Sequence, residues 1–420
     1  MYDTTAVVVG LGYVGLPLAV LAREKGWEVI GIDIDENKVS QISNKQVPFE
    51  DNELQKQLSA HPITATTDFA DIRRGAVIVI AVPTPVTSTN EPDLIPLKNA
   101  LVAARPHLQP GQTVIVESTI NPGVMDEVVA PILAQRKDIL IAHCPERINP
   151  GDPAWSVRNI PRVLGAYSQE GAAKALKFYE SILEAPVKVM QSPTEAEAVK
   201  ILENTFRDVN IAFVNEMARS FDKLNIDIIN VINGASTKPF GFMPHFPGNG
   251  VGGHCISVDP YYMIERGRQA GFDHKFLKLA RKINENMPAY TVSRLEDAAA
   301  ELGLTVSDAQ VAVLGVAYKR NVADTRNSPA LKILKLLGAK GWNTIAFDSH
   351  VPAKSTVDSL PDALAQADII LIGCDHDDLI RDLSVATLVQ NGIQIIIDGK
   401  NALNPKTISD AGIVYRGIGR

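Results

Sequence analysis

The chain has 420 residues, of which 45% are hydrophobic and 21% charged, a balance typical of globular proteins and unlike that of disordered chains. A single hydrophobic core seldom grows beyond about 300 residues, so we expect two or three domains. The formal net charge of -7 gives no electrostatic reason to expect nucleic acid or an anionic membrane as a partner.

Two features of the sequence bear on its compartment. Cys144, Cys255 and Cys374 are too few for a disulfide framework and lack the paired spacing of a metal site, so we expect reduced thiols, a cytoplasmic location and no bound metal. Glycines and a proline interrupt the apolar stretch at residues 6–22, which we interpret as a strand running into a helix and not as a signal peptide. No other stretch approaches the roughly 20 apolar residues needed to span a bilayer, so we expect no membrane span.

Apolar and amphipathic runs alternate along most of the chain. The alternation at residues 5–191, as in AVVVG, WEVIGID and AVIVIAV, predicts strand and helix units around a parallel sheet. An unbroken apolar pattern from Ser192 to Leu224 predicts one long helix, and the stretch at residues 237–260, rich in Gly, Pro and Phe, predicts an ordered functional loop. A second alternation begins near Ala309. We therefore predict an α/β fold, with two Rossmann-like, doubly wound parallel-sheet domains joined by the long helix and a central all-α domain, divided as 1–191, 192–300 and 301–420.

The first turn from strand to helix carries the glycine spacing of a dinucleotide-binding site. Gly10 allows the tight turn, Gly12 lets the backbone approach a pyrophosphate, and Gly15 permits close packing of the helix. Asp33, at the end of the next apolar run, would accept hydrogen bonds from the adenosine ribose and repel a 2'-phosphate, which favours NAD over NADP. The alternative is a glycine turn that binds nothing. Lys38 could reach the same ribose or be a solvated helix residue.

Cys255 has the setting of a nucleophile. It lies in GVGGHCISVD, where the preceding glycines allow backbone to approach a ligand closely and Asp259 follows four residues later. A lone cysteine is more often a small buried hydrophobe, which is our interpretation of Cys144 and Cys374. The polar, flexible surroundings of Cys255 favour a nucleophile instead, and we expect His254 only to shape the loop.

Polar residues at two other places could take part in chemistry. Lys200 and Asn204 share a face of the predicted long helix, with Asp208 one turn further, and could stabilise an oxyanion or donate a proton. Spacing alone favours the alternative of a solvated helix face. Thr119 and Glu146 each follow an apolar run, at the carboxyl ends of strands where ligands of open α/β sheets bind.

Seven motifs, in order along nearly the whole chain, resemble those of the UDP-glucose/GDP-mannose dehydrogenase family. They are GLGYVGLP at 10–17, VPTP at 82–85, ESTINPG at 117–123, CPERINPG at 144–151, KILENTFRDVNIAFVNE at 200–216, PGNGVGGHCISVDP at 247–260 and GVAYKRNVADTRNSP at 315–329. The resemblance implies an NAD domain, a central helical dimerisation domain and a C-terminal domain contributing to the UDP site. It also implies a homodimer and a four-electron oxidation at C6 of a UDP-sugar, with two NAD reduced per sugar.

By position, the resemblance makes Cys255 the nucleophile, forming a thiohemiacetal and then a thioester. Lys200 and Asn204 would stabilise developing oxygen charge, while Asp259 and a water near Thr119 would assist proton transfer and hydrolysis. The residues predicted to contact NAD are Gly10, Gly12, Tyr13, Val14, Gly15, Asp33, Lys38, Pro83, Thr84, Thr119 and Arg326. Those predicted to contact the sugar nucleotide are Glu146, Arg147, Lys200, Asn204, Gly252 and Lys319.

One departure from the family pattern concerns the substrate. Members that oxidise UDP-glucose usually carry a second glutamate four residues after the one matching Glu146, and this chain has Pro150 there. The PERINPG form resembles the branch acting on UDP-N-acetylhexosamines, so we expect such a sugar, with UDP-N-acetyl-D-mannosamine as the first choice and a polysaccharide precursor as the product. The basic residue that family members lend across the dimer has only Lys238 as its nearest counterpart.

Three other functions stay open. Plain UDP-glucose 6-dehydrogenase is the competing enzyme, and a two-electron hydroxyacid dehydrogenase would share the glycine turn but would not need Cys255. A nucleotide-sugar-binding regulator without catalysis is the alternative outside enzymes, although a binder needs no thiol nucleophile.

Overall fold

The computed structural model describes residues 4–87, 91–134, 136, 138–148 and 154–420. The chain divides into two compact units, one made of residues 1–203 and 261–272 and the other of residues 204–260 and 273–420. Two helices, α7 (Pro193–Lys223) and α9 (Asp259–Gln269), pass from one unit into the other. The long helix predicted at Ser192 to Leu224 is thus confirmed, whereas the domain boundaries at residues 191 and 300 stay predictions.

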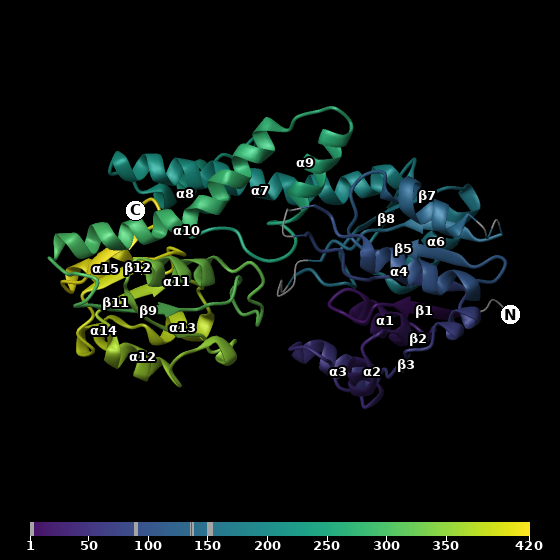
Figure 1. Ribbon diagram of the computed structural model, residues 1–420, viewed down its shortest axis with the longest axis horizontal. Coiled ribbons are helices and arrows are strands. Elements are labelled where there is room, and N and C mark those ends of the chain that lie inside the picture. The colour runs from purple at the N-terminus through teal and green to yellow at the C-terminus, as the bar shows by residue number, and fades with distance from the viewer. Residues whose placement is uncertain (1–3, 88–90, 135, 137, 149–153) are drawn as a thin grey trace. The chain divides into compact units, whose positions relative to one another are not determined.

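The first unit is built on an eight-stranded sheet with the order β3-β2-β1-β4-β5-β6-β7-β8 (Figure 1). Six of the seven neighbouring pairs are parallel, and only β6 and β7 pair in the antiparallel sense. Parallel pairing needs a crossover, and none of the described residues between β6 and β7 is helical. The sheet therefore departs from the expected parallel arrangement at this pair. The strands are β1 (Thr5–Val9), β2 (Glu28–Ile32), β3 (Thr64–Thr66), β4 (Val77–Ile80), β5 (Thr113–Val116), β6 (Leu140–His143), β7 (Arg162–Ala166) and β8 (Val187–Val189).

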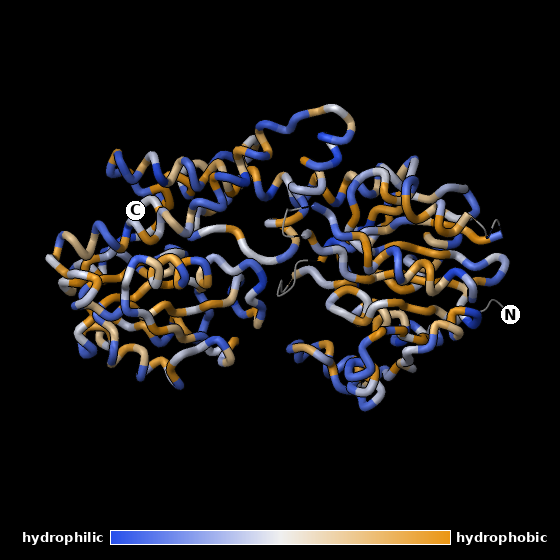
Figure 2. Tube along the Cα trace, in the orientation of Figure 1, coloured by the Kyte–Doolittle hydropathy of each residue, from blue (hydrophilic) through white to orange (hydrophobic). Residues whose placement is uncertain are grey.

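Both faces of this sheet are buried. Along β1, Ala6 and Val8 belong to one hydrophobic cluster while Val7 and Val9 belong to another, as expected for a strand whose side chains alternate between two covered faces. Figure 2 shows the strands of this unit mostly in the colour of hydrophobic residues. The helices are α1 (Gly15–Glu24), α2 (Glu36–Ser43), α3 (Asn52–Ala60), η1 (Phe69–Arg74), α4 (Ile95–Ala104), η2 (Arg105–His107), η3 (Met125–Val129), α5 (Ala130–Leu133) and α6 (Gln169–Ile182).

The second unit contains a five-stranded, fully parallel sheet with the order β10-β9-β11-β12-β13. The two Rossmann-like sheets and the helical segment between them in sequence confirm the predicted fold class. The strands are β9 (Gln310–Leu314), β10 (Asn343–Phe347), β11 (Ile369–Ile372), β12 (Ile395–Asp398) and β13 (Val414–Gly417). The helices are α8 (Ile228–Ala235), α10 (Lys275–Glu301), α11 (Pro329–Ala339), η4 (Pro352–Lys354), α12 (Leu360–Gln366), α13 (Asp377–Asp382), α14 (Val385–Gln390) and α15 (Pro405–Asp410).

The loop between α8 and α9 is ordered by buried side-chain amides. Asn215 of α7 accepts a 3.0 Å hydrogen bond from the Gly248 backbone nitrogen, and its own amide donates to Asn284 of α10. Asn249 is fully buried and donates a 2.8 Å bond to the Gly373 carbonyl. These bonds confirm the predicted ordered loop, although helix α9 already begins at Asp259. Within the described residues, no helix combines the length and the apolar character that crossing a membrane requires.

Candidate active site

The glycine turn after β1 has three positions with different surroundings. Gly10 has a φ of +93°, and a Cβ there would lie 2.6 Å from the Ala81 carbonyl oxygen. A Cβ on Gly15 would lie 1.9 Å from the Gly10 carbonyl oxygen, whereas a Cβ on Gly12 would meet nothing within 4 Å. The backbone is therefore packed tightly on two sides of the turn and open at Gly12. Among the described residues, no side chain caps the N-terminus of α1; the Leu16 and Leu18 nitrogens donate to the Gly12 and Val14 carbonyls, and Pro17 has no N–H.

Asp33 follows β2 and ties the turn together. Its Oδ2 accepts a 2.9 Å hydrogen bond from the Leu11 backbone nitrogen and lies 3.2 Å from Lys38 Nζ. The carboxylate is only 7% exposed, and its Oδ1 accepts a 3.0 Å hydrogen bond from the Asp35 nitrogen, which leaves a lone pair of that oxygen for a further donor. Lys38 thus contacts Asp33, which excludes a purely solvated role. A glycine cradle open at Gly12 and an acid at the next strand end fit the pyrophosphate and ribose of NAD.

Two strand ends meet beside this turn. The Thr84 hydroxyl donates a 2.6 Å bond to the Thr119 carbonyl, and the Ser118 hydroxyl donates a 2.7 Å bond to the Val82 carbonyl. The Tyr262 hydroxyl of α9 donates to the Thr84 carbonyl. The structure therefore brings the predicted residues Thr84 and Thr119 together. Of the other predicted NAD contacts, Pro83 is exposed, Val14 is half-buried, and Tyr13 is 40% exposed, with its ring centre 4.2 Å from that of Phe49 and tilted by 30° to it.

Glu197, which sequence reasoning missed, anchors the segment after Thr119. Its two carboxylate oxygens each accept a 2.7 Å bond, one from the Gly123 nitrogen and one from the Met125 nitrogen. Burial raises the pKa of Glu197 to about 7, against the opposing effect of these two backbone bonds. Lys200 lies one turn further along α7 and is 7% exposed. The only sequence signal for Glu197 was its place on the face of the helix that carries Lys200.

Glu146 and Arg147 follow β6 and are held by different partners. Glu146 is 4% exposed, and its Oε1 accepts bonds of 2.6 Å and 2.8 Å from the Arg147 and Ile148 nitrogens. The Arg147 guanidinium pairs with Glu203 of α7 and donates a 2.9 Å bond to the Pro161 carbonyl. The predicted role of Arg147 in substrate binding would require it to share these contacts. Pro150, the basis for the N-acetylated substrate, lies outside the described residues.

In the second unit, the Cys255 loop rests on the segment that follows β9. The Gly253 nitrogen donates a 2.9 Å bond to the Arg326 carbonyl, and Asn327 donates a 3.0 Å bond to the Gly253 carbonyl. A Cβ on Gly252 would lie 2.7 Å from the Tyr318 Cβ, so the absence of a side chain permits this close packing.

The thiol itself is half-buried beside an imidazole. Cys255 Sγ lies 3.5 Å from His254 Nε2, a contact that the interpretation of His254 as a loop residue did not include. The Cys255 carbonyl accepts bonds of 3.0 Å and 2.8 Å from the Val258 and Asp259 nitrogens, which leads the chain into α9. Cys144 and Cys374 are fully buried, as predicted, and all three cysteines are free of disulfides.

The polar face of α7 is buried. Asn204 and Asp259 are 7% and 3% exposed, and the Asn204 amide donates a 2.6 Å bond to Asp259 Oδ2. Asp208 is fully buried and accepts bonds of 2.6 Å and 2.8 Å from Arg281 and Asn284 of α10. The alternative of a solvated helix face is therefore wrong, because α10 covers it at Asp208. The Asp208 carboxylate binds to side chains of α10, while the Asn204 amide binds to Asp259.

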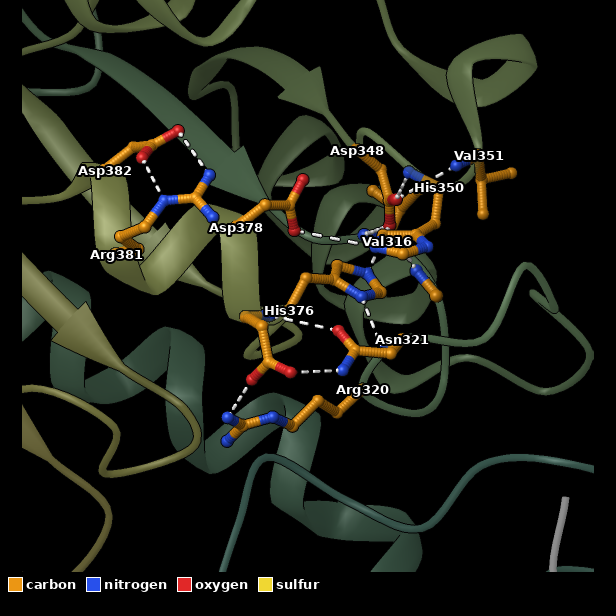
Figure 3. Close-up of polar contacts among 12 residues, drawn as sticks. Val316, Arg320, Asn321, Asp348, His350, Val351, His376, Asp378, Arg381 and Asp382 are labelled. Carbon is orange, nitrogen blue, oxygen red and sulfur yellow. Dashed lines mark hydrogen bonds and ion pairs between the residues drawn. The ribbon is translucent and has the colours of Figure 1, made fainter. Parts of the chain in front are cut away.

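The turn after β9 is anchored by an internal network (Figure 3). Asp348 accepts a 2.6 Å bond from the Val316 nitrogen, the same relation that Asp33 has to the first glycine turn. Asp348 is 1% exposed, however, and His376 Nε2 lies 3.2 Å from it. The Asn321 nitrogen lies 2.9 Å from His376 Nδ1, which leaves Nε2 to face Asp348. Asp348 therefore fixes the loop after β9 and is too buried to contact a ligand.

The basic residues of that loop are more accessible. Lys319 is half-buried, and Arg326 is 47% exposed, with its Nε 2.9 Å from Asp324 Oδ2. A phosphate at Arg326 would have to share the guanidinium with Asp324. Lys238 is exposed, with its Nζ 4.7 Å from the centre of the Phe240 ring.

A glycine turn that fits NAD, on a Rossmann-like sheet, is the arrangement of an NAD-dependent dehydrogenase. Comparison with known proteins makes this more specific, since three models of one family match consecutive parts of the chain: the NAD binding domain at residues 4–183, the central domain at 194–286 and the UDP binding domain at 312–405. The chain belongs to the UDP-glucose/GDP-mannose dehydrogenase family, and it is an NAD-dependent nucleotide-sugar dehydrogenase.

Individual relatives are similar over most or nearly all of their length. The chain is 35% identical to UDP-N-acetyl-D-mannosamine dehydrogenase of Pyrococcus horikoshii over 424 residues, covering 98% of each chain. It is 35% identical to UDP-N-acetyl-D-glucosamine 6-dehydrogenase of Pseudomonas aeruginosa over 363 residues, covering 85% of each. The solved structure of the Pyrococcus horikoshii UDP-D-ManNAc dehydrogenase matches with a TM-score of 0.91, 34% identity and 99% of both chains covered.

Proposed function

We propose that the chain oxidises the C6 alcohol of a UDP-N-acetylhexosamine to the carboxylate, a four-electron reaction, with UDP-N-acetyl-D-mannosamine as the first choice of substrate. The observation that carries the proposal is the Cys255 loop, in which a half-buried thiol stands next to His254 and four residues before the buried pair of Asp259 and Asn204. A two-electron dehydrogenase has no need of such a thiol. The names of the relatives from Pyrococcus horikoshii and Pseudomonas aeruginosa, which are dehydrogenases of UDP-N-acetylhexosamines, support an N-acetylated sugar.

The Cys255 thiol would let the aldehyde be converted to the carboxylate through two covalent intermediates. Bound NAD would accept a hydride from C6 in each of two oxidations. The Cys255 thiolate would add to the C6 aldehyde, forming a C–S bond and a thiohemiacetal, whose oxidation leaves a thioester. Water would then cleave the C–S bond, releasing the carboxylate and restoring the thiol. Since the aldehyde carbon is captured covalently, no free aldehyde needs to leave.

The other predicted residues would stabilise developing charge and assist proton transfer. Lys200 and Asn204 would stabilise negative charge on the C6 oxygen, and Asp259 would assist proton transfer during hydrolysis. A water near Thr119 would serve the same steps, and Glu146 would lie at the substrate and nicotinamide end. The burial of Lys200, Asn204 and Asp259, all at 7% exposure or less, supports these roles because buried charges and dipoles act more strongly than solvated ones.

Cofactor and nucleotide would be held by separate sets of residues. The predicted NAD set begins with the cradle at Gly10 to Gly15 and the acid Asp33, whose packing fits a dinucleotide. Arg326 would meet a cofactor phosphate, and Lys319 would meet the UDP phosphates, with Gly252 allowing close approach of the sugar nucleotide.

We also propose that the enzyme is a homodimer through its helical part. Large apolar side chains of the second unit are between 46% and 69% exposed, and such surfaces mark protein interfaces. They are Phe206, Phe213, Phe240, Met243, Phe246, Phe276 and Leu279. Light scattering should give wild type a mass near twice 45.4 kDa and Phe213→Glu a mass near 45.4 kDa. Equal masses for the two proteins would contradict this interface.

A reducing compartment such as the cytoplasm suits this chemistry, because Cys255 has to be a free thiol. The product, a nucleotide-linked uronic acid, suits the synthesis of a polysaccharide.

The substrate class is tested by initial rates of NADH formation. Purified protein is supplied with UDP-N-acetylmannosamine, UDP-N-acetylglucosamine, UDP-N-acetylgalactosamine or UDP-glucose. We expect the highest kcat/KM with UDP-N-acetylmannosamine, at least tenfold above UDP-glucose. A preference for UDP-glucose would replace the proposed substrate with the competing one, and binding without NADH formation would favour a regulator.

A further inference from the structure

Arg162, the first residue of β7, lies between two acidic side chains of the first unit. Its side chain is fully buried, with one terminal nitrogen paired to Glu146 and the other 3.4 Å from Glu117 Oε1. Both carboxylates are also buried, at 4% and 1% exposure. A planar guanidinium can contact two carboxylates at once, which a lysine ammonium at the end of a flexible chain does less well.

The two acids differ in their remaining contacts. Glu146 Oε1 is fixed by two backbone N–H groups, so its second oxygen turns toward Arg162. Glu117 Oε1 accepts a 2.6 Å bond from the Tyr179 hydroxyl of α6. Glu117 Oε2 is buried and makes no hydrogen bond to any residue that the structure describes. Glu146 thus has two backbone donors and a close ion pair with Arg162, whereas Glu117 has one hydroxyl donor and a 3.4 Å contact with Arg162.

The surroundings of Glu117 favour its protonated form. Burial raises the pKa of Glu117 to about 7, with the nearby Glu146 adding to the rise and Arg162 and Tyr179 opposing it. Burial also raises the pKa of the Cys144 thiol to about 12 and lowers the pKa of His143 to about 3. Two acids and one guanidinium carry a surplus negative charge when both acids are ionised, and a proton on Glu117 removes it.

We propose that Arg162 is a positioning residue for the candidate active-site carboxylate of Glu146, and that Glu117 competes with Glu146 for the same buried guanidinium. The inference rests on the proposed function, because it concerns the residue that would meet the substrate. When Glu117 is protonated, Arg162 forms an ion pair with Glu146 alone. With Glu117 ionised, the guanidinium is shared and Glu146 is held less firmly.

The first test compares the pH dependence of kcat in matched glutamine variants. Glu117→Gln keeps the shape of the side chain but cannot ionise, while Glu180→Gln makes the same change on the exposed side of α6. We expect the ratio of kcat in Glu117→Gln to kcat in wild type to be near one at pH 6 and to rise at least about threefold by pH 8.5. The ratio for Glu180→Gln should stay flat. A flat or falling ratio for Glu117→Gln would overturn the proposal.

Two further variants separate positioning from folding. Arg162→Lys keeps the charge but not the planar fork, so kcat should fall at least about tenfold while the KM for NAD stays within about twofold. Unchanged kcat in folded Arg162→Lys would overturn the positioning role. If Arg162→Lys does not fold, Tyr179→Phe serves instead: it removes a bond that stabilises ionised Glu117, so the inflection in kcat should move to higher pH. An unmoved inflection would count against the proposal.

The same assays distinguish this inference from the proposed function. Wild type that forms no NADH from any UDP-sugar would overturn the function itself. Wild type that turns over, with a pH profile unchanged in Glu117→Gln, would overturn only the competition at Arg162.

Discussion

The side-chain amide of Asn204 donates a 2.6 Å hydrogen bond to Asp259 Oδ2, joining helix α7 to the first residue of α9. Asp259 follows Cys255 by one turn and its backbone nitrogen also bonds the Cys255 carbonyl. The acid is therefore fixed from two directions, by its own backbone and by a neutral donor that leaves its charge intact. We infer that Asn204 aims Asp259 in addition to any contact it makes with substrate.

Asp259→Asn tests whether that charge matters. The amide keeps the size of the side chain and can still accept the bond from Asn204, so folding should be retained. We expect kcat to fall at least about 100-fold with the Kd for NAD unchanged, because a proton acceptor is lost while the cofactor residues are untouched. Stopped-flow absorbance and NAD titration would measure the two quantities. Asp273→Asn, on an exposed residue, is the matched control, and equal activity in both variants would remove Asp259 from the chemistry.

The glycine turn offers a pair of variants with opposite expectations. Gly12→Ala adds a methyl group where nothing lies within 4 Å, so the melting temperature should not change, but the methyl group would occupy the face left open for a pyrophosphate. NAD affinity should therefore fall at least about tenfold. Gly15→Ala places its Cβ 1.9 Å from the Gly10 carbonyl oxygen and should destabilise the fold itself. Scanning calorimetry would measure the melting temperature of both variants, and titration calorimetry would measure their affinity for NAD. A wild-type NAD affinity in Gly12→Ala would show that the cofactor does not approach this face.

The Asp208 and Arg281 pair should be structural. Arg281→Leu leaves the Asp208 carboxylate fully buried without its cation, and loss of one partner of a buried pair costs about 3 to 5 kcal/mol. Urea unfolding of the variant should show a loss of this order. Glu285→Gln breaks only the half-exposed contact of Arg281 and should cost less than about 1 kcal/mol. Similar small losses in both variants would show that Asp208 finds another partner.

Glu197 should make stability depend on pH. Its pKa in the folded state is raised to about 7 from 4.5, mainly by burial, so between these values the folded state binds the proton more tightly than the unfolded chain. The contribution is fully present below pH 4.5 and is lost as pH rises through about 7, a change of up to about 3 kcal/mol. Glu197→Gln cannot titrate, so its free energy of unfolding should fall less than that of wild type between pH 5 and pH 8. Parallel pH profiles would contradict the assignment.

Much of the fold could be predicted because its signals are local. The spacing of Gly10, Gly12 and Gly15, an acid at the next strand end, and an apolar pattern without a breaker from residue 192 to 224 each report on a short stretch of chain. The antiparallel pairing of β6 with β7 was not predictable in this way, because an apolar run does not reveal its direction in a sheet.

The candidate site was only partly predictable for the same reason. The family motifs point to Cys255, Lys200, Asn204 and Asp259, but burial of the α7 face depends on Arg281, 73 positions away from Asp208. Arg162 gave no signal beyond a charged residue at the start of an apolar run. Its partners Glu117 and Glu146 lie on other segments, and only the folded sheet brings the three together.

The most direct test of the account is the amount of NADH formed when a limiting, known quantity of UDP-N-acetylmannosamine is exhausted, measured with wild type and with Cys255→Ser. Four-electron oxidation through the thiol predicts about two NADH per sugar in wild type, with the uronic acid as the product, and loss of complete oxidation in the variant. One NADH per sugar with release of an aldehyde, or two NADH per sugar without the Cys255 thiol, would contradict it.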